Sequence, residues 1–183
     1  MALTKIQSLG ITDGTIVNAD INASAAIVST KLSGAGKVLQ VVSTTKTDSF
    51  NSSSTSLVDI TGLSVSITPS SASNKILVFG SIASNTVNGA IIHFQLVRGS
   101  TEIAKGTNAY TYVGTIGTYM EGSSTNYNIA NNSFHFYDSP SSTSSTTYKI
   151  QTKNNTGGTT YINNRGTNDS SFISTITVVE IAG

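Results

Sequence analysis

Tyrosine and asparagine side chains gather in two segments of the sequence, and these residue types are suited to ligand binding. The first segment, 107–137, alternates them with Gly and Ser, and the second, Asn154–Arg165, adds an aromatic ring and a guanidinium. Tyr and Asn are adaptable contact residues in binding loops, and sugars are bound by aromatic faces and amide hydrogen bonds. The plainer alternative, which we favour, is that these tyrosines pack at strand edges or at a subunit interface. The candidate receptor contacts are Tyr110, Tyr112, Tyr119, Asn126, Tyr127, Asn128, Tyr161 and Arg165.

No pattern in the sequence predicts a catalytic or metal centre. His93 and His135 each lie in an apparent strand without a carboxylate at ligand spacing, so we expect surface or interface histidines. The chain has no cysteine and no nucleophile elbow, phosphate-binding loop or zinc-protease motif. Its nine acidic residues are scattered, and a glycosidase pair of distant carboxylates stays only a minor alternative. The sequence therefore predicts no enzyme, no cofactor and no metal.

The low charge of the chain narrows the classes of partner. Charged residues make up 10% of the sequence and the net charge is +1, without a basic stripe, which argues against nucleic-acid binding. No apolar run approaches the ~20 residues of a membrane span, so we expect no membrane insertion. Abundant Val, Ile and Thr suit strands. A polar, weakly charged β surface is typical of proteins whose many copies lie side by side.

Residues 1–37 differ from the rest of the chain. Large aliphatic side chains recur at steps of five or six residues, which matches neither the helical nor the strand period. A single chain with this spacing has no core of its own, but several copies wound together could bury the repeats on an axis. A loose leader, or an amphipathic helix through Ala19–Leu32, is the alternative. The predicted stem for trimerisation or docking uses Ile6, Ile11, Ile16, Ile21, Ile27 and Leu32.

From residue 38 to 183 the pattern is one of short strands and turns. Leu63, Val65 and Ile67 alternate with serines, and Pro69 with a serine cluster ends that strand. Asn88-Gly89 predicts a hairpin between the strands on either side of it. The fold class predicted for 38–183 is an all-β, antiparallel β-sandwich or jelly-roll head. The expected strands are 38–44, 57–60, 63–68, 75–83, 90–98, 101–105, 110–113, 116–120, 133–137, 146–152, 159–162 and 171–181.

The stretch ITDGTIVNADINASAAIVSTKLSG, residues 11–34, resembles the leader of tail-fibre and virion structural proteins of marine phages, especially cyanophages. Three head segments are also similar to that family: GLSVSITPSSASNKILV at 62–78, LVRGSTEIAKG at 96–106 and STITVVEI at 174–181. Together these cover about a third of the chain. The leader is the more specific signal, since any sandwich built of Ser, Thr and Val would give similar strands.

The resemblance implies a homotrimer with a jelly-roll head of the tumour-necrosis-factor or C1q shape, and a non-enzymatic virion role. The expected partners are copies of the chain itself and, through the stem, a tail, baseplate or capsid protein, with a host surface glycan as a further candidate. A tail-fibre-type appendage for host attachment is ahead of a capsid-decorating head fibre, and a free carbohydrate-binding module comes last. The N-terminal MALTKIQSLG lacks the apolar region of a secretory signal, which predicts synthesis in the host cytoplasm and a place on the virion.

Overall fold

The computed structural model of the protein describes residues 37–86, 91–107, 113–119, 128–155, 157–167 and 169–183. Within these ranges the chain forms eleven β-strands and no helix, which confirms the predicted all-β class. It follows that no helix in the described part is long and apolar enough to cross a membrane. The stem predicted over residues 1–37 lies outside the described residues except for Lys37, so its aliphatic repeat stays a prediction.

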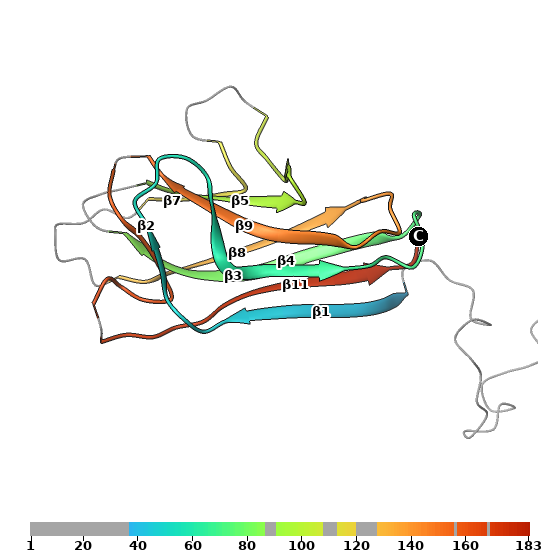
Figure 1. The fold of residues 1–183 in the computed structure, drawn as a ribbon, viewed down its shortest axis with the longest axis horizontal. Coiled ribbons are helices and arrows are strands. Elements are labelled where there is room, and N and C mark those ends of the chain that lie inside the picture. Colours follow the sequence, from blue (N-terminus) through green and yellow to red (C-terminus); the bar gives the residue numbers. More distant parts are fainter. Residues whose placement is uncertain (1–36, 87–90, 108–112, 120–127, 156, 168) are drawn as a thin grey trace, which may run out of the picture. The chain divides into compact units, whose positions relative to one another are not determined.

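The strands form two antiparallel sheets that pack face to face (Figure 1). The first sheet contains β1 (Val38–Lys46), β2 (Phe50–Ser52), β4 (Lys75–Thr86), β8 (Ala130–Asp138), β10 (Thr160–Ile162) and β11 (Ser174–Ile181). The second contains β3 (Val58–Ile67), β5 (Ile91–Arg98), β6 (Thr101–Ile103), β7 (Ile116–Tyr119) and β9 (Thr146–Asn154). The predicted sandwich is therefore confirmed.

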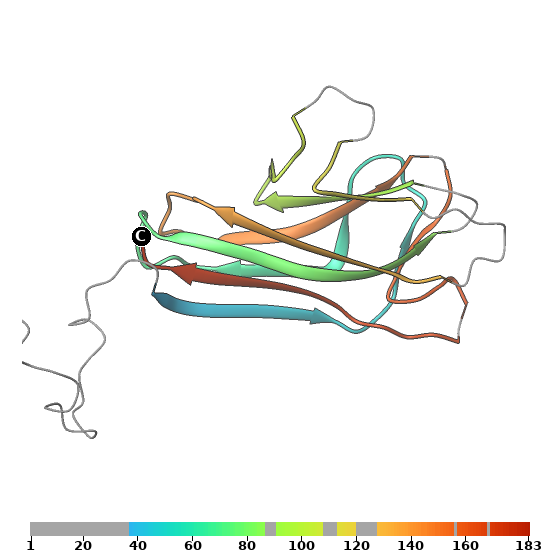
Figure 2. The ribbon, with the colours of Figure 1, turned by 180° about the vertical axis from the view of Figure 1, so that it is seen from behind.

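The pairing of the long strands is nested around the middle of the described chain. β1 pairs with β11, β3 with β9 and β4 with β8, while β5 pairs with β6 and β7, which follow it directly. In the first sheet β11 lies between β1 and β4, and in the second β9 lies between β3 and β5 (Figure 2). Such nesting, with the chain alternating between two sheets, is the strand order of a jelly roll.

The core lies between the two sheets and follows the two-residue period of the strands. On β4, Ile76, Val78 and Ile82 are fully buried, while Phe79 points outward and is 40% exposed. From the second sheet Phe94 and Tyr148 fill the opposite side of the same core. Full burial of one such apolar side chain contributes about 1.5–3 kcal/mol, which explains how the head can fold without disulfides.

Two local features of the strands differ from the sequence prediction. The stretches 57–60 and 63–68 form one strand, β3, in which the register against β9 shifts between Asp59 and Ser64. Gly62 has a φ of 81° in this irregularity, a backbone conformation that a side chain disfavours. The short strand β2 was not predicted, because Phe50-Asn51-Ser52 has no alternating pattern of its own. The predicted strand 110–113 lies outside the described residues except for Val113, which is not in a strand.

The predicted hairpin around Asn88-Gly89 is wrong as a pairing of neighbouring strands. These two residues lie outside the described ranges, but β4 before them belongs to the first sheet and β5 after them to the second. β4 pairs instead with β8, β10 and β11. A turn sequence indicates that the chain reverses direction, and it does not decide whether the next strand returns beside the first or crosses to the other sheet.

The outer faces of the two sheets differ in character. One row across the first sheet joins Val41, Val179, Leu77 and Tyr137 on β1, β11, β4 and β8. Val41 is 59% and Tyr137 55% exposed, so this face presents large apolar groups to solvent. The outer face of the second sheet is polar and charged: Lys149 Nζ lies 2.8 Å from Asp59, which also accepts a hydrogen bond from Gln151.

A buried carboxylate organises one end of the sandwich. Glu180 on β11 is fully buried, and its oxygens accept hydrogen bonds from Gln40 Nε2 (2.6 Å), the Ser70 amide (2.6 Å) and Asn74 Nδ2 (2.5 Å). Burial raises the pKa of Glu180, but the hydrogen bonds from Asn74, Gln40 and Ser70 outweigh it and hold the pKa below its usual range. The β3–β4 connection is thereby fixed to β1 and β11 where the described chain begins and ends.

A second buried carboxylate joins the two sheets. Asp138 at the end of β8 accepts hydrogen bonds from Arg98 of β5 at 2.8 and 2.9 Å and from the Tyr148 hydroxyl of β9 at 2.6 Å. Burial, followed by the bond to Asp138, raises the pKa of Tyr148 far above its usual value, so this phenol stays a hydrogen-bond donor. Both sheets are therefore connected by charge as well as by apolar packing.

Candidate functional site

The tyrosine-rich candidates fall mostly outside the described part of the chain. Tyr110, Tyr112, Asn126 and Tyr127 lie in undescribed segments, and for Tyr119 only the backbone, in β7, is described. Asn128 is exposed just before β8. Their role as receptor contacts therefore stays a prediction.

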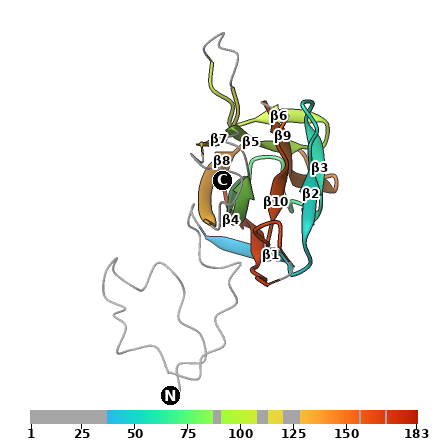
Figure 3. The same cartoon turned by 90° about the vertical axis from the view of Figure 1, so that its left-hand side faces the viewer.

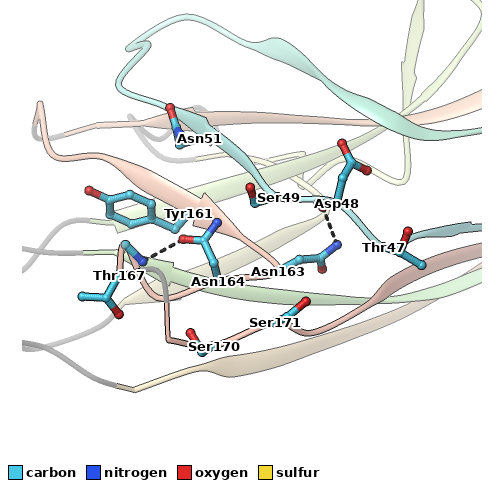
Figure 4. Close-up of a pocket in the computed structure, with 11 residues that line it drawn as sticks. Thr47, Asp48, Ser49, Asn51, Tyr161, Asn163, Asn164, Thr167, Ser170 and Ser171 are labelled. Atoms are coloured by element: carbon cyan, nitrogen blue, oxygen red, sulfur yellow. Dashed lines mark hydrogen bonds between the residues drawn. The ribbon is translucent and has the colours of Figure 1, made fainter.

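The structure does place Tyr161 in a pocket. The cavity has a volume of about 520 Å³ and lies between the β1–β2 connection and the loop that joins β10 to β11 (Figure 4). Its lining is polar throughout: Thr47, Asp48, Ser49, Asn51, Tyr161, Asn163, Asn164, Gly166, Thr167, Ser170 and Ser171. β1 and β11 separate beyond the Lys46–Ser174 pair. The β1–β2 connection, which contributes Thr47, Asp48 and Ser49 to the lining, therefore lies at the end of the first sheet opposite the start of β1 (Figures 1 and 3).

The floor of the pocket is held by the buried side chain of Asn163. Its Nδ2 donates to the carbonyl oxygens of Lys46 at 2.9 Å and Asp48 at 3.0 Å, and its Oδ1 accepts from Ser174 Oγ at 2.6 Å. The residue has a φ of 62°, in the left-handed region that Asn tolerates better than most residues. This one amide therefore connects the end of β1, the end of β10 and the start of β11.

The β10–β11 loop is stabilised by its own side chains. Asn164 Oδ1 accepts a hydrogen bond from the Gly166 amide at 2.7 Å, and Asn164 Nδ2 donates to the Ile162 carbonyl at 3.2 Å. Arg165 forms an ion pair with Asp169, which also accepts from Thr167. The hydrogen bonds from Arg165 and then Thr167 hold the pKa of Asp169 far below its usual range. We conclude that side-chain contacts within the loop hold the described part of this wall.

Arg165, predicted as a receptor contact, is placed beside the pocket rather than in its lining. Its guanidinium is engaged by Asp169, and its carbonyl accepts a hydrogen bond from Asn85 Nδ2 of β4 at 3.0 Å. In the described structure Arg165 thus orders the loop. Its contact with a receptor stays a prediction.

One ion pair sets the charge of the pocket. Lys46 Nζ, on a side chain only 1% exposed, lies 2.9 Å from the Asp48 carboxylate, which is 77% exposed. The hydrogen bond from Lys46 is the main cause of the lowered pKa of Asp48. Since the ammonium neutralises the carboxylate, the site has no net charge of either sign. It is therefore suited to neutral polar ligands.

The two histidines lie in different surroundings in the described structure. His93 is buried on β5 with Asn155 against its Nε2, and burial, with the nearby Lys153, lowers its pKa. The expectation of a surface or interface position is thus wrong for His93. His135 is exposed on the outer face of the first sheet, opposite Phe79. Among the described residues no group of three or more His, Asp or Glu side chains is placed to hold a metal ion.

Comparison with known proteins shows no family for this chain. No protein-family model matches it, and no curated protein does. Solved structures of infectious bursal disease virus match it in part. For the Gx strain the identity is 16% and the TM-score 0.37, over 79% of this chain and 37% of that one. For the Gt strain the identity is 15% and the TM-score 0.40, over 81% of this chain and 39% of the other. The chain thus spans less than two fifths of the length of those virus proteins.

Sequence reasoning missed most of the pocket. The β1–β2 connection and the serines before β11 are too common in this Ser- and Thr-rich chain to stand out. The signal that could have found the site is Asn163-Asn164 followed by Gly166, since Asn and Gly favour left-handed backbone and Asn caps turns with its side chain. Tyr161 was singled out for its aromatic ring, and the structure places that ring in the lining.

Proposed function

We propose that the protein is a non-enzymatic virion structural protein, a trimeric appendage of tail-fibre type. Residues 1–37 dock it on the particle, and the β-sandwich head is exposed for host attachment. The observation that carries the proposal is the separation of surfaces on the head. An apolar face suited to copies of the chain lies on the first sheet, and a polar pocket lies at the end opposite Lys37.

The outer face of the first sheet supports association between copies. It exposes Val41, Phe79 and Tyr137, the last two on adjacent strands. Such large exposed apolar groups on one face mark an interaction surface. Among the outward positions of β1, β11, β4 and β8, Lys75 carries the only fixed charge, so identical faces can meet without like-charge repulsion. The low overall charge of the chain points to the same partner, a further copy.

The two ends of the head support an outward-facing role for the pocket. Ala182 donates a backbone hydrogen bond to the Lys37 carbonyl at 2.8 Å, so the chain joins the head beside its C-terminal residues (Figure 1). β1 then runs nine residues to Lys46, about 30 Å at the usual rise of a strand. If residues 1–37 are bound to the particle, the pocket end is the one farther from the attachment point.

Association through the first sheet is tested by replacing one exposed ring. We expect Phe79→Thr to weaken the oligomer, because it removes an apolar group from the face while keeping a residue that favours strands. Phe172→Thr is the matched control: Phe172 is 41% exposed against 40% for Phe79, but it lies in the β10–β11 loop. Sedimentation velocity of the full chain across a concentration series gives the oligomeric state of each variant.

A trimer in the wild type and the control, with dissociation of Phe79→Thr at lower concentration, is the expected result. A monomeric wild type, or equal effects of both substitutions, would refute the interface. The position on the particle is tested by cryo-electron microscopy of the virion. Density at the tail supports host attachment, whereas density on capsomers would replace it by a capsid-decorating head fibre.

A further inference from the structure

We propose that the pocket between the β1–β2 connection and the β10–β11 loop binds a neutral saccharide unit. The inference rests on the proposed function, because it names the ligand class at the end of the head assigned to host attachment. Four observations support it: hydrogen-bonding groups that have no partner within the described protein, a β10–β11 loop held by its own side chains, an aromatic ring, and an ion pair that leaves the site without net charge.

The hydrogen-bonding groups of the pocket divide into used and unused sets. The side-chain amides of Asn163 and Asn164 are engaged in hydrogen bonds within the protein. By contrast, six lining residues have side-chain groups without a hydrogen-bond partner among the described residues: Thr47, Ser49, Asn51, Tyr161, Ser170 and Ser171. Hydroxyl and amide groups both donate and accept, as sugar hydroxyls do. The unused set therefore matches a ligand with several hydroxyl groups.

Ser170 gives the most specific indication of a ligand. Ser170 is a lining residue of the cavity, but its Oγ is turned away from solvent and has no hydrogen-bond partner in the described structure. Buried hydroxyls in folded proteins are normally hydrogen-bonded. Rotation of the Ser170 side chain about its Cα–Cβ bond would bring this oxygen to a ligand hydroxyl in the pocket.

The aromatic ring of the pocket, that of Tyr161, packs closely against Gly166. Gly166 has a φ of 86°, and a Cβ atom built on it would lie 2.8 Å from the Tyr161 ring, so glycine is required for this close approach. On Tyr161 itself the hydroxyl is one of the unused groups. The ring of a tyrosine can pack against the C–H face of a sugar, while its hydroxyl forms a hydrogen bond with a hydroxyl at the edge of the same sugar.

Charge and size limit the ligand further. The Asp48 carboxylate is exposed at the pocket and Lys46 is already paired with it, so an anionic sugar would meet a carboxylate without a free cation beside it. The volume of about 520 Å³ falls within the range of roughly 300–1,000 Å³ that is typical of small-molecule sites. A neutral mono- or disaccharide fits both limits.

The test measures sugar binding to the full chain by saturation-transfer NMR and titration calorimetry. The probes are glucose, galactose, mannose and N-acetylglucosamine, with N-acetylneuraminic acid as the anionic comparison. Tyr161→Thr removes the ring, and Ser170→Ala removes the unpartnered hydroxyl, which should not lower stability because no intramolecular hydrogen bond is lost. Ser64→Ala, at an exposed position on the outer face of the second sheet, is the matched control.

We expect at least one neutral sugar to bind the wild type and the Ser64→Ala control. We expect binding about tenfold weaker for each pocket variant, which corresponds to about 1.4 kcal/mol. The inference is overturned if no neutral sugar binds, if only N-acetylneuraminic acid binds, or if binding survives both pocket substitutions.

Attachment itself is tested separately, by competition of the purified chain with virion adsorption to host cells. A chain that blocks adsorption without binding any sugar overturns the saccharide site and leaves attachment standing. A chain that binds sugar through Tyr161 and Ser170 but does not block adsorption overturns attachment and leaves the site standing.

Discussion

Replacing Asn163 by Ala tests how the pocket is built. The substitution removes three hydrogen bonds, to the carbonyls of Lys46 and Asp48 and from Ser174 Oγ, each worth about 1 kcal/mol net. Ala also tolerates a φ of 62° less well than Asn does, because it has no polar side chain to stabilise the left-handed backbone, which costs about 1 kcal/mol more. We therefore expect the free energy of unfolding to fall by about 4 kcal/mol.

The measurement is urea unfolding followed by circular dichroism at one fixed protein concentration, because association contributes to apparent stability. Asn163→Gly is the matched control, since it loses the same hydrogen bonds but tolerates the left-handed backbone. We expect the Gly variant to lie between the wild type and the Ala variant. The reasoning is refuted if Asn163→Ala loses less than about 1 kcal/mol, or if the Ala variant is the more stable of the two.

Two further predictions concern the buried carboxylates. Glu180→Gln should lower stability by about 2 kcal/mol at neutral pH, because the amide NH₂ group would face the donors that now bind the carboxylate. As the folded pKa of Glu180 lies below its usual 4.5, the wild type loses this stabilisation as the pH falls through the folded value, whereas the variant does not. Parallel stability profiles from pH 7 down to about 3 would contradict this. Tyr148→Phe removes the 2.6 Å hydrogen bond to Asp138 and should cost about 2 kcal/mol, while Tyr137→Phe on the outer face should cost nothing measurable by the same unfolding assay.

The strands of the head could be predicted because their residues alternate with the period of a half-buried sheet. Leu63, Val65 and Ile67 are all buried, as their spacing indicates. The sheet to which each strand belongs could not be predicted, because that choice depends on contacts between distant strands. β4 and β9 each pair with strands far away in the sequence, and the Asn88-Gly89 turn gave no indication of this.

Of the pocket residues, only Tyr161 was predicted from the sequence as a candidate contact. Its other walls come from 47–51 and 163–171, more than a hundred residues apart, and they meet because β2 and β10 are paired. Asn163 does not stand out by its residue type, because the chain is rich in Asn. Its importance arises from three contacts that exist only after β1, β10 and β11 have been brought together.

Strand β1 belongs to both of the surfaces on which the proposals rest. Its outward residue Val41 is part of the apolar face, while Lys46 at its end points inward and pairs with Asp48 of the pocket. Alternation along the strand separates the two roles, since residues 41 and 46 lie on opposite faces of the sheet. A polar residue at position 41 should therefore weaken association without changing the pocket. By contrast, Lys46→Met should remove the positive charge that neutralises the Asp48 carboxylate, without changing the apolar face. If both substitutions changed both properties, β1 would move as a unit, and assembly and ligand binding would be coupled through it.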